Sequence, residues 1–210
     1  MEIQKKYIYD LLTRISHAGI GGISLLLFLS AQLANLFFES GNIRHFIWLV
    51  HIYLGYLLVS FFVTRIIWLF KGPKYSRLSN LIQIKEWKNI LLSKGKGAVK
   101  WGWGHHPLAS LAYLGLYLII AVLIFSGFIL ARIQFDLGPV PEKYYDDVRF
   151  LSSYKDGHYI ASVGLLFFTV VHIWALFHHQ KKDKVPAFES MKTGYQYKLS
   201  TPGDLENEND

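Results

Sequence analysis

Cysteine is absent from the 210-residue sequence, and methionine occurs only at Met1 and Met191. Without cysteine the chain cannot hold an iron–sulfur cluster, a thiolate-bound zinc ion or a disulfide. Acidic residues are also few, 15 against 22 Lys and Arg, which gives a formal net charge of +7. Such a charge can indicate nucleic-acid binding. In this chain, however, the cations lie beside the ends of long apolar runs, which argues against nucleic acid and for a membrane surface.

Apolar residues make up 52% of the chain and gather into long runs. A helix of about 20 uncharged residues spans the hydrocarbon core of a bilayer and satisfies its own backbone hydrogen bonds there. Four runs reach this length and predict transmembrane helices at about residues 15–38, 46–70, 108–131 and 158–179. We therefore predict an all-α membrane protein whose residues 1–199 form one four-helix transmembrane bundle, followed by a disordered acidic tail at residues 200–210.

The segments that join these runs differ in charge. Lys and Arg concentrate before the first run, between the second and third, and after the fourth, whereas the other two connections have few cations or balance them with acids. Because positively charged loops stay in the cytoplasm, both termini are predicted there, in a multi-pass protein of the bacterial inner membrane. The basic connection at residues 71–104 contains Trp87, Ile90, Leu91 and Leu92. This pattern predicts a short helix lying on the anionic leaflet.

Four of the nine histidines are well placed inside the predicted spans. Ionisable side chains are costly in lipid and usually mark function. His158 and His172 share the fourth run, where an ideal helix separates them by about 21 Å on nearly the same face. His17 lies near the cytoplasmic end of the first run and His51 in the outer part of the second. The predicted pairs are therefore His51 with His158 outside and His17 with His172 inside.

Paired imidazoles on different helices supply the two axial ligands that the iron of a planar macrocycle needs. Neither methionine lies in a span, and no cysteine is present to attach the group covalently. The sequence thus predicts two non-covalent haem b groups with bis-histidine ligation, which favours electron transfer over oxygen chemistry.

Two assignments stay open on the residues alone. His45 lies closer to the outer surface than His51 and matches the depth of His158 better, so it rivals His51 as the outer ligand. Arg65 lies near the predicted depth of the inner haem, where it could pair with a propionate. A snorkelling arginine close to the inner interface is at least as good an interpretation.

Short motifs along nearly the whole chain resemble the b-type cytochrome subunit of membrane-bound nickel–iron hydrogenases, within the wider superfamily of bacterial four-helix di-haem cytochromes b. They are Arg14 with His17, Ile43-Arg44, His51 with Gly55-Tyr56, Gly104-His105-His106-Pro107-Leu108, His158, His172, and Ser190-Met191-Lys192-Thr193-Gly194-Tyr195. Ala18 and His106 stand where that family usually has tryptophan and asparagine.

The resemblance implies that His17, His51, His158 and His172 are the haem ligands, and so favours His51 over His45. It also implies an electron-transfer subunit of an oxidoreductase complex. Such a subunit anchors a periplasmic hydrogenase, receives electrons through its iron–sulfur subunit and reduces membrane quinone, either menaquinone or ubiquinone.

Other functions fit the same residues. One is a stand-alone quinol-oxidising cytochrome b, or the membrane subunit of another periplasmic reductase or dehydrogenase, such as one for thiosulfate or formate. Another is a haem-free anchor or transporter whose histidines make only helix contacts.

Two further predictions concern regions near the membrane faces. The outer loop at residues 134–157 is long, and we expect it to form part of a docking surface for the redox partner. The quinone site is expected near the inner haem, around residues 104–108, with Asp10, His105 and His106 as candidate proton-handling groups.

Overall fold

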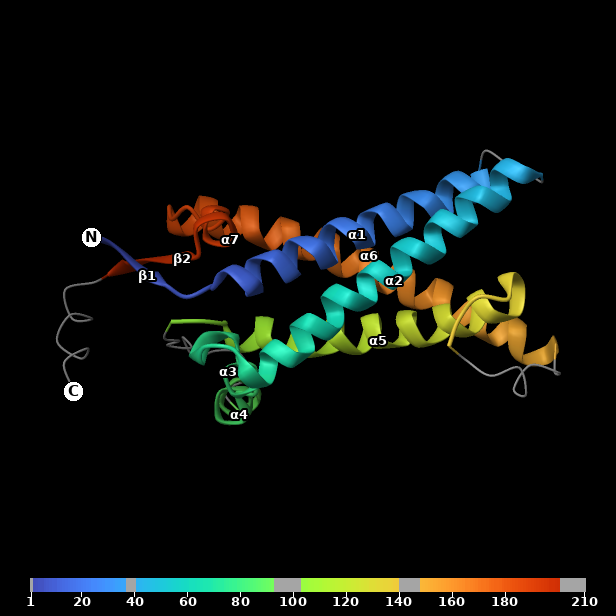
Figure 1. The fold of residues 1–210 in the computed structure, drawn as a ribbon. Coiled ribbons are helices and arrows are strands. Elements are labelled where there is room, and N and C mark those ends of the chain that lie inside the picture. Colours follow the sequence, from blue (N-terminus) through green and yellow to red (C-terminus); the bar gives the residue numbers. More distant parts are fainter. Residues whose placement is uncertain (1, 37–40, 93–102, 140–147, 201–210) are drawn as a thin grey trace. The chain divides into compact units, whose positions relative to one another are not determined.

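The computed structural model describes residues 2–36, 41–92, 103–139 and 148–200. Four long helices dominate it (Figure 1): α1 (Leu11–Leu36), α2 (Asn42–Lys71), α5 (Pro107–Phe135) and α6 (Val148–Asp183). Each is long and apolar enough to cross a bilayer. The predicted fold class, a helical membrane protein with four transmembrane helices, is confirmed.

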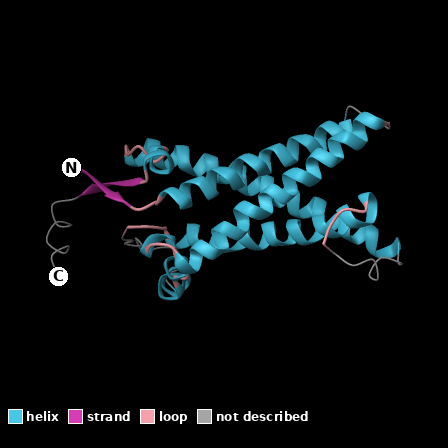
Figure 2. Ribbon diagram, in the orientation of Figure 1, coloured by secondary structure: helices cyan, strands magenta, loops and turns pink. Residues whose placement is uncertain are grey.

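Short helices and two strands accompany the long helices in the described part of the chain, and Figure 2 distinguishes the two kinds by colour. They are β1 (Glu2–Tyr7), the 3-10 turn η1 (Lys74–Ser76), α3 (Leu78–Leu81), α4 (Ile84–Leu92), α7 (Glu189–Thr193) and β2 (Tyr195–Ser200). The short helix expected in the basic connection is α4, in which Leu91 and Leu92 expose 79% and 80% of their surface. The indole N–H of Trp87 donates to the Pro107 carbonyl oxygen at 2.8 Å, which ties α4 to the start of α5.

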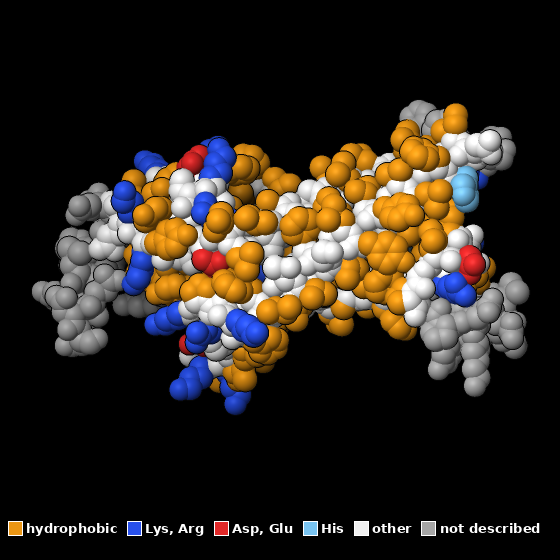
Figure 3. Space-filling model, viewed as in Figure 1, with side chains coloured by type: hydrophobic (Ala, Val, Ile, Leu, Met, Phe, Trp, Pro, Cys, Tyr) orange, Lys and Arg blue, Asp and Glu red, His pale blue; other side chains and the backbone are white. Residues whose placement is uncertain are grey.

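The long helices expose much of their apolar surface. Leu118 on α5 and Phe167 on α6 expose 68% and 70% of their area, and Figure 3 shows apolar side chains spread over these helices. In water such surface would be strongly unfavourable, whereas lipid covers it without cost. The same view shows Lys and Arg side chains around α3, α4 and α7.

The chain divides into two compact units, each built from parts of several helices. The first consists of residues 1–15, 65–114 and 169–210, and the second of residues 16–64 and 115–168. The long helices run from one unit into the other. Among the described residues, the two strands and the short helices thus lie in the first unit, and the helical residues of the second unit belong to the four long helices.

In the first unit, β1 and β2 join the two ends of the chain. They pair antiparallel, with Glu2 opposite Ser200 and Tyr7 opposite Tyr195. Gly194 makes the turn from α7 into β2 with φ +87°, and its carbonyl oxygen accepts the N–H groups of Ile8 and Tyr9 at 2.9 and 3.0 Å. A side chain at Gly194 would be strained by that φ and would meet the Tyr9 carbonyl at 2.5 Å. No strand was expected, because the partners lie at opposite ends of the sequence.

β2 also holds the segment that leads into α5. The Gln196 amide accepts the Gly104 N–H at 2.8 Å and donates to the Gly104 carbonyl at 3.0 Å. The cations of Lys6 and Lys198 lie over the Trp103 ring, 5.7 and 5.2 Å from its centroid. These contacts fix the backbone just before Pro107, the first residue of α5.

Both boundaries predicted for the outer loop at residues 134–157 are wrong. α5 continues to Phe135, and α6 begins at Val148 rather than near His158. Charged residues such as Lys155 and Asp156 indicated a loop, but a helix that extends out of the membrane carries charges readily. Residues 140–147 lie outside the described part of the chain, as do residues 201–210 of the expected acidic tail.

Candidate functional site

The rings of His51 on α2 and His158 on α6 lie next to each other in the second unit. Their ring centroids are 6.4 Å apart, and the ring planes are inclined at 66°. A bond from a metal to an imidazole nitrogen is about 2 Å long, and that nitrogen lies about 1 Å from the ring centre, so two rings bound to opposite sides of one metal have centres about 6 Å apart. The observed separation fits a shared metal.

The Nδ1 atoms of both rings make hydrogen-bond contacts with neighbouring helices. His51 Nδ1 lies 3.0 Å from Ser30 Oγ and 3.1 Å from the Leu27 carbonyl oxygen. His158 Nδ1 lies 2.9 Å from Ser126 Oγ. In each ring this leaves Nε2 as the nitrogen for a metal, the usual arrangement in which the second nitrogen is held by an outer partner.

His45, the rival outer ligand, has a different neighbour. Its ring packs on Phe135 of α5, with centroids 5.2 Å apart and planes inclined at 30°. Among the described ring contacts, the neighbour of His158 on α2 is His51.

Open space lies next to this pair on α2. A Cβ atom added to Gly55, one turn after His51, would meet nothing within 4 Å. On α5, a Cβ on Gly127 would come to 3.5 Å from Cε1 of His158. A flat macrocycle needs this kind of clearance beside its ligands, so the surroundings of the pair fit a haem.

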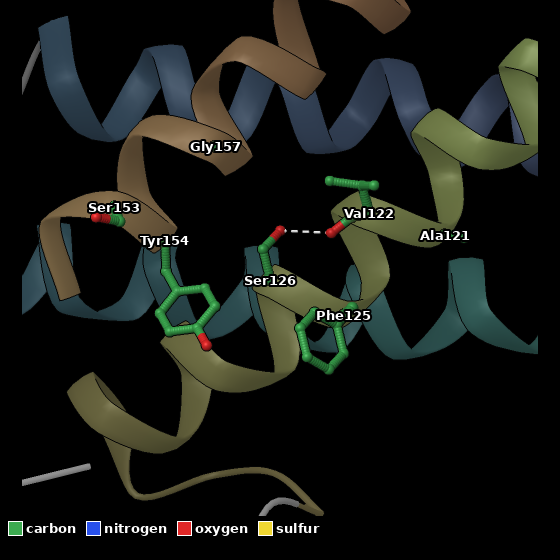
Figure 4. Close-up of a pocket in the computed structure, with 7 residues that line it drawn as sticks. All are labelled: Ala121, Val122, Phe125, Ser126, Ser153, Tyr154 and Gly157. Atoms are coloured by element: carbon green, nitrogen blue, oxygen red, sulfur yellow. Dashed lines mark hydrogen bonds between the residues drawn. The ribbon is translucent and has the colours of Figure 1, made fainter. Parts of the chain in front are cut away.

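A pocket of about 350 Å³ adjoins the pair between α5 and α6 (Figure 4). Its walls are mostly apolar, and the Ser126 hydroxyl faces into it while donating to the Val122 carbonyl at 2.6 Å. The lining residues are Ala121, Val122, Phe125, Ser126, Ser153, Tyr154 and Gly157. Small residues at Ser153 and Gly157 create this space.

His17 and His172, the predicted inner pair, belong to different units. His17 lies near the start of α1 in the second unit, with its side chain exposed. His172 is half-buried on α6 in the first unit, where its ring centroid lies 6.1 Å from that of Tyr113 on α5. Their pairing stays a prediction.

Aromatic rings connect His172 to the segment before α5. The Tyr113 ring lies 5.5 Å from the His105 ring, which lies 6.2 Å from the Tyr9 ring. His105 Nδ1 is 3.0 Å from the Asn80 side-chain oxygen, an acceptor, so Nδ1 is the donor. Burial, and then the charge of Arg65, lower the pKa of His105 to about 4. His105 is therefore neutral at physiological pH.

Asp10, one of the expected proton-handling groups, has a structural role at the start of α1. It is the N-cap of α1, and Oδ1 accepts the Thr13 N–H at 3.1 Å and the Trp68 indole N–H at 2.9 Å. Oδ2 accepts the hydroxyls of Thr13 and Ser76 at 2.7 and 2.8 Å. Burial raises the pKa of Asp10, but these hydrogen bonds together outweigh it and leave the pKa below its ordinary value. Such a carboxylate holds its charge and fixes α1 against α2 and η1.

Two more predicted residues lie close by. Arg65 is 7% exposed and donates to the Ser76 carbonyl oxygen at 3.3 Å, so part of its guanidinium already contacts the segment after α2. His106 is the N-cap of α5, and its Nδ1 accepts the Leu108 N–H at 3.2 Å. Burial, and then the charge of His179, lower the pKa of His106. The capping interpretation thus accounts for His106.

Sequence reasoning missed Ser30, Ser126 and Tyr113. Nothing in the sequence distinguishes Ser30 or Ser126 from Ser24 or Ser60, which also lie within apolar runs. Tyr113 is one of 13 tyrosines. Only the packing of the helices shows which of these side chains meet a histidine.

Comparison with known proteins gives two matches. The family described as prokaryotic cytochrome b561 matches residues 8–194. A protein of Bradyrhizobium diazoefficiens, named as a probable Ni/Fe-hydrogenase B-type cytochrome subunit, is 28% identical over 170 residues, which cover 75% of this chain and 67% of the relative. No solved structure matches the chain.

Proposed function

The chain belongs to the prokaryotic cytochrome b561 family, a family of multi-pass membrane cytochromes that bind haem b, and from this premise we propose that it is a di-haem electron-transfer subunit. It takes electrons from a periplasmic partner, a nickel–iron hydrogenase, and passes them to membrane quinone. The relative from Bradyrhizobium, by its name, is a subunit of such a complex, which supports this choice of partner.

The observation that carries the proposal is the position of His51 opposite His158, with ring centres 6.4 Å apart. These two residues are the proposed axial ligands of the outer haem. A bound haem b supplies a one-electron carrier, and two histidine ligands leave its iron no open position for oxygen. The chain contributes the orientation of the rings and the apolar surroundings.

The inner haem is proposed to lie between His17 and His172, a pairing that rests on sequence position. Arg65 is the proposed partner of a propionate. Arg65 is buried where it contacts the Ser76 carbonyl, and a guanidinium pairs readily with a carboxylate. Electrons entering outside must cross the bilayer, where one charge moved through 100 mV corresponds to about 2.3 kcal/mol.

Both chain ends are proposed to lie in the cytoplasm. The pairing of β1 with β2 requires the two ends to be on one side of the membrane, which supports an even number of crossings. The quinone is proposed to bind near the inner haem, beside the first unit. Neutral His105, with Tyr9 and Tyr113 on either side, is the proposed polar group there.

The test is hydrogen-dependent quinone reduction in membranes that contain the assembled complex. His51→Ala should lower this rate at least about tenfold, as removal of a metal-site residue does, while hydrogen-dependent reduction of an artificial dye by the soluble subunits stays normal. His45→Ala is the matched control and should retain both activities.

Two results would contradict the proposal. Normal quinone reduction in His51→Ala would exclude His51 from the electron path, and loss of quinone reduction in His45→Ala alone would make His45 the ligand. Co-purification of a thiosulfate or formate enzyme in place of a hydrogenase would replace the proposed partner.

A further inference from the structure

We infer that Ser30 and Ser126 are positioning residues for the outer haem, because they hold both ligand rings in the tautomer that binds iron; this inference rests on the function proposed above. The two serines lie on different helices, α1 and α5, and each contacts the Nδ1 atom of one histidine of the pair.

The hydroxyl protons of both serines are already committed to backbone carbonyls. Ser30 donates to the Leu27 carbonyl at 2.9 Å, and Ser126 donates to the Val122 carbonyl at 2.6 Å. A serine hydroxyl has a single proton to donate but two lone pairs to accept. Each serine oxygen is therefore an acceptor toward the histidine beside it.

The histidines must then supply the proton. His51 Nδ1 also lies 3.1 Å from the Leu27 carbonyl oxygen, which can only accept. His158 likewise has the Leu123 carbonyl as a hydrogen-bond acceptor. Nδ1 of each ring thus carries hydrogen, and Nε2 of each ring carries the lone pair that a metal requires.

The same arrangement occurs on both sides of the pair. In α1 the acceptors come from Leu27 and Ser30, and in α5 from Leu123 and Ser126, in each case a leucine followed three residues later by a serine. A helix places such residues next to each other, so the carbonyl and the hydroxyl face one imidazole together.

Two consequences follow for a bound iron. A ligand that already lacks a proton on Nε2 binds without releasing one. A ring that donates its Nδ1–H to an acceptor is more basic, which favours ferric over ferrous iron and lowers the midpoint potential. Ser30 and Ser126 therefore set the potential of the outer haem without touching it.

The experiment is a spectroscopic redox titration of the purified, haem-loaded full chain. Ser30→Ala and Ser126→Ala should each raise the midpoint potential of one haem component only, by about 59 mV if the ferric preference falls tenfold. The double variant should shift the same component further. The electron paramagnetic resonance signal of that low-spin ferric haem depends on the orientation of the two imidazole planes, so this signal should change in the double variant as well.

Two variants serve as controls. Ser60→Ala removes an exposed hydroxyl of α2 in the same unit, which donates to the Tyr56 carbonyl at 3.2 Å, and should leave both potentials unchanged. Ser126→Thr keeps the hydroxyl, so its midpoint potential should stay at the wild-type value and not rise as in Ser126→Ala.

The double variant at full haem content decides the role of the serines. If both of its haem components keep the wild-type midpoint potentials and ferric resonances, that role is overturned, while the proposed function stays intact. Absence of haem from the wild-type protein would instead contradict the proposed function itself. Loss of the outer haem alone from a helical, folded Ser126→Ala protein would support the positioning role.

Discussion

At the scale of residues, the neighbour of each histidine determines what its ring can do. Ser30 and Ser126 contact the Nδ1 atoms of His51 and His158, and in the tautomer that we infer they accept from Nδ1 and leave Nε2 for a metal. The hydrogen bond of His106 has the opposite direction, because its Nδ1 accepts the backbone N–H of Leu108 and so caps α5. Identical side chains thus divide into ligand candidates and structural groups according to hydrogen-bond direction.

His105 makes the stability of the first unit depend on pH. Its pKa falls from 6.5 in an unfolded chain to about 4 in the folded one, because burial and then Arg65 disfavour its charged form. Above pH 6.5 both states are neutral and the contribution to stability is complete. As pH falls from 6.5 to about 4, the unfolded state binds the proton more readily, so stability decreases by an amount on the order of 3 kcal/mol.

The measurement is the thermal unfolding midpoint in detergent from pH 8 to pH 4. Wild-type protein should lose stability below pH 6.5, and His105→Gln, which keeps a donor but cannot become charged, should lose less over the same window. His106 titrates in the same direction and contributes to the remaining slope. Equal slopes for wild type and His105→Gln would show that His105 is not responsible.

At the scale of elements, the start of α1 is held at several points. Asp10 joins α1 to Trp68 at the end of α2 and to Ser76 in η1, and the Arg14 guanidinium donates to the carbonyl oxygen of Lys192 in α7. His17 lies about two helical turns after Asp10. The proposed inner ligand therefore takes its position from a helix end that three segments of the first unit fix, namely the end of α2, η1 and α7.

Asp10→Ala should destabilise the protein by about 2 to 3 kcal/mol. About 1 kcal/mol comes from the lost N-cap, and the remainder from the polar groups of Trp68 and Ser76 that lose an acceptor. Thermal unfolding followed by circular dichroism measures this. Ser60→Ala removes a hydroxyl that donates only to the Tyr56 carbonyl of its own helix and should have little effect.

Haem retention during this unfolding adds a second readout. Because Asp10 fixes the helix end that carries His17, Asp10→Ala should release the inner haem at a lower temperature than the outer one. Simultaneous release of both haems at the wild-type temperature would contradict the role given to this cap.

Some secondary-structure elements could be predicted from the sequence, and others could not. Four apolar runs were enough to place the long helices, because lipid requires apolar length. The start of α6 at Val148 was missed because its first turns carry charges outside the membrane. β1 and β2 were missed because pairing of Glu2 with Ser200 depends on how the helices bring the chain ends together, and no local pattern encodes that.

At the scale of the whole molecule, the class of the candidate site could be predicted from the sequence, but the residues that form it only in part. Costly histidines in apolar runs indicated a metal-binding cytochrome, and the family match supports that class. Depth along a helix could not separate His45 from His51, because both lie on α2 less than two turns apart. Packing distinguishes them, since the His45 ring contacts Phe135 and the His51 ring lies next to that of His158.

The central claim is that two histidine pairs hold two haem groups in one chain. Its most direct test is the ratio of extractable haem to protein in purified wild type, His158→Ala and His172→Ala. We predict two haems per chain in wild type and one in each variant, with different components missing from the reduced-minus-oxidised spectrum. A ratio of one in wild type, or of two in His158→Ala, would contradict the account.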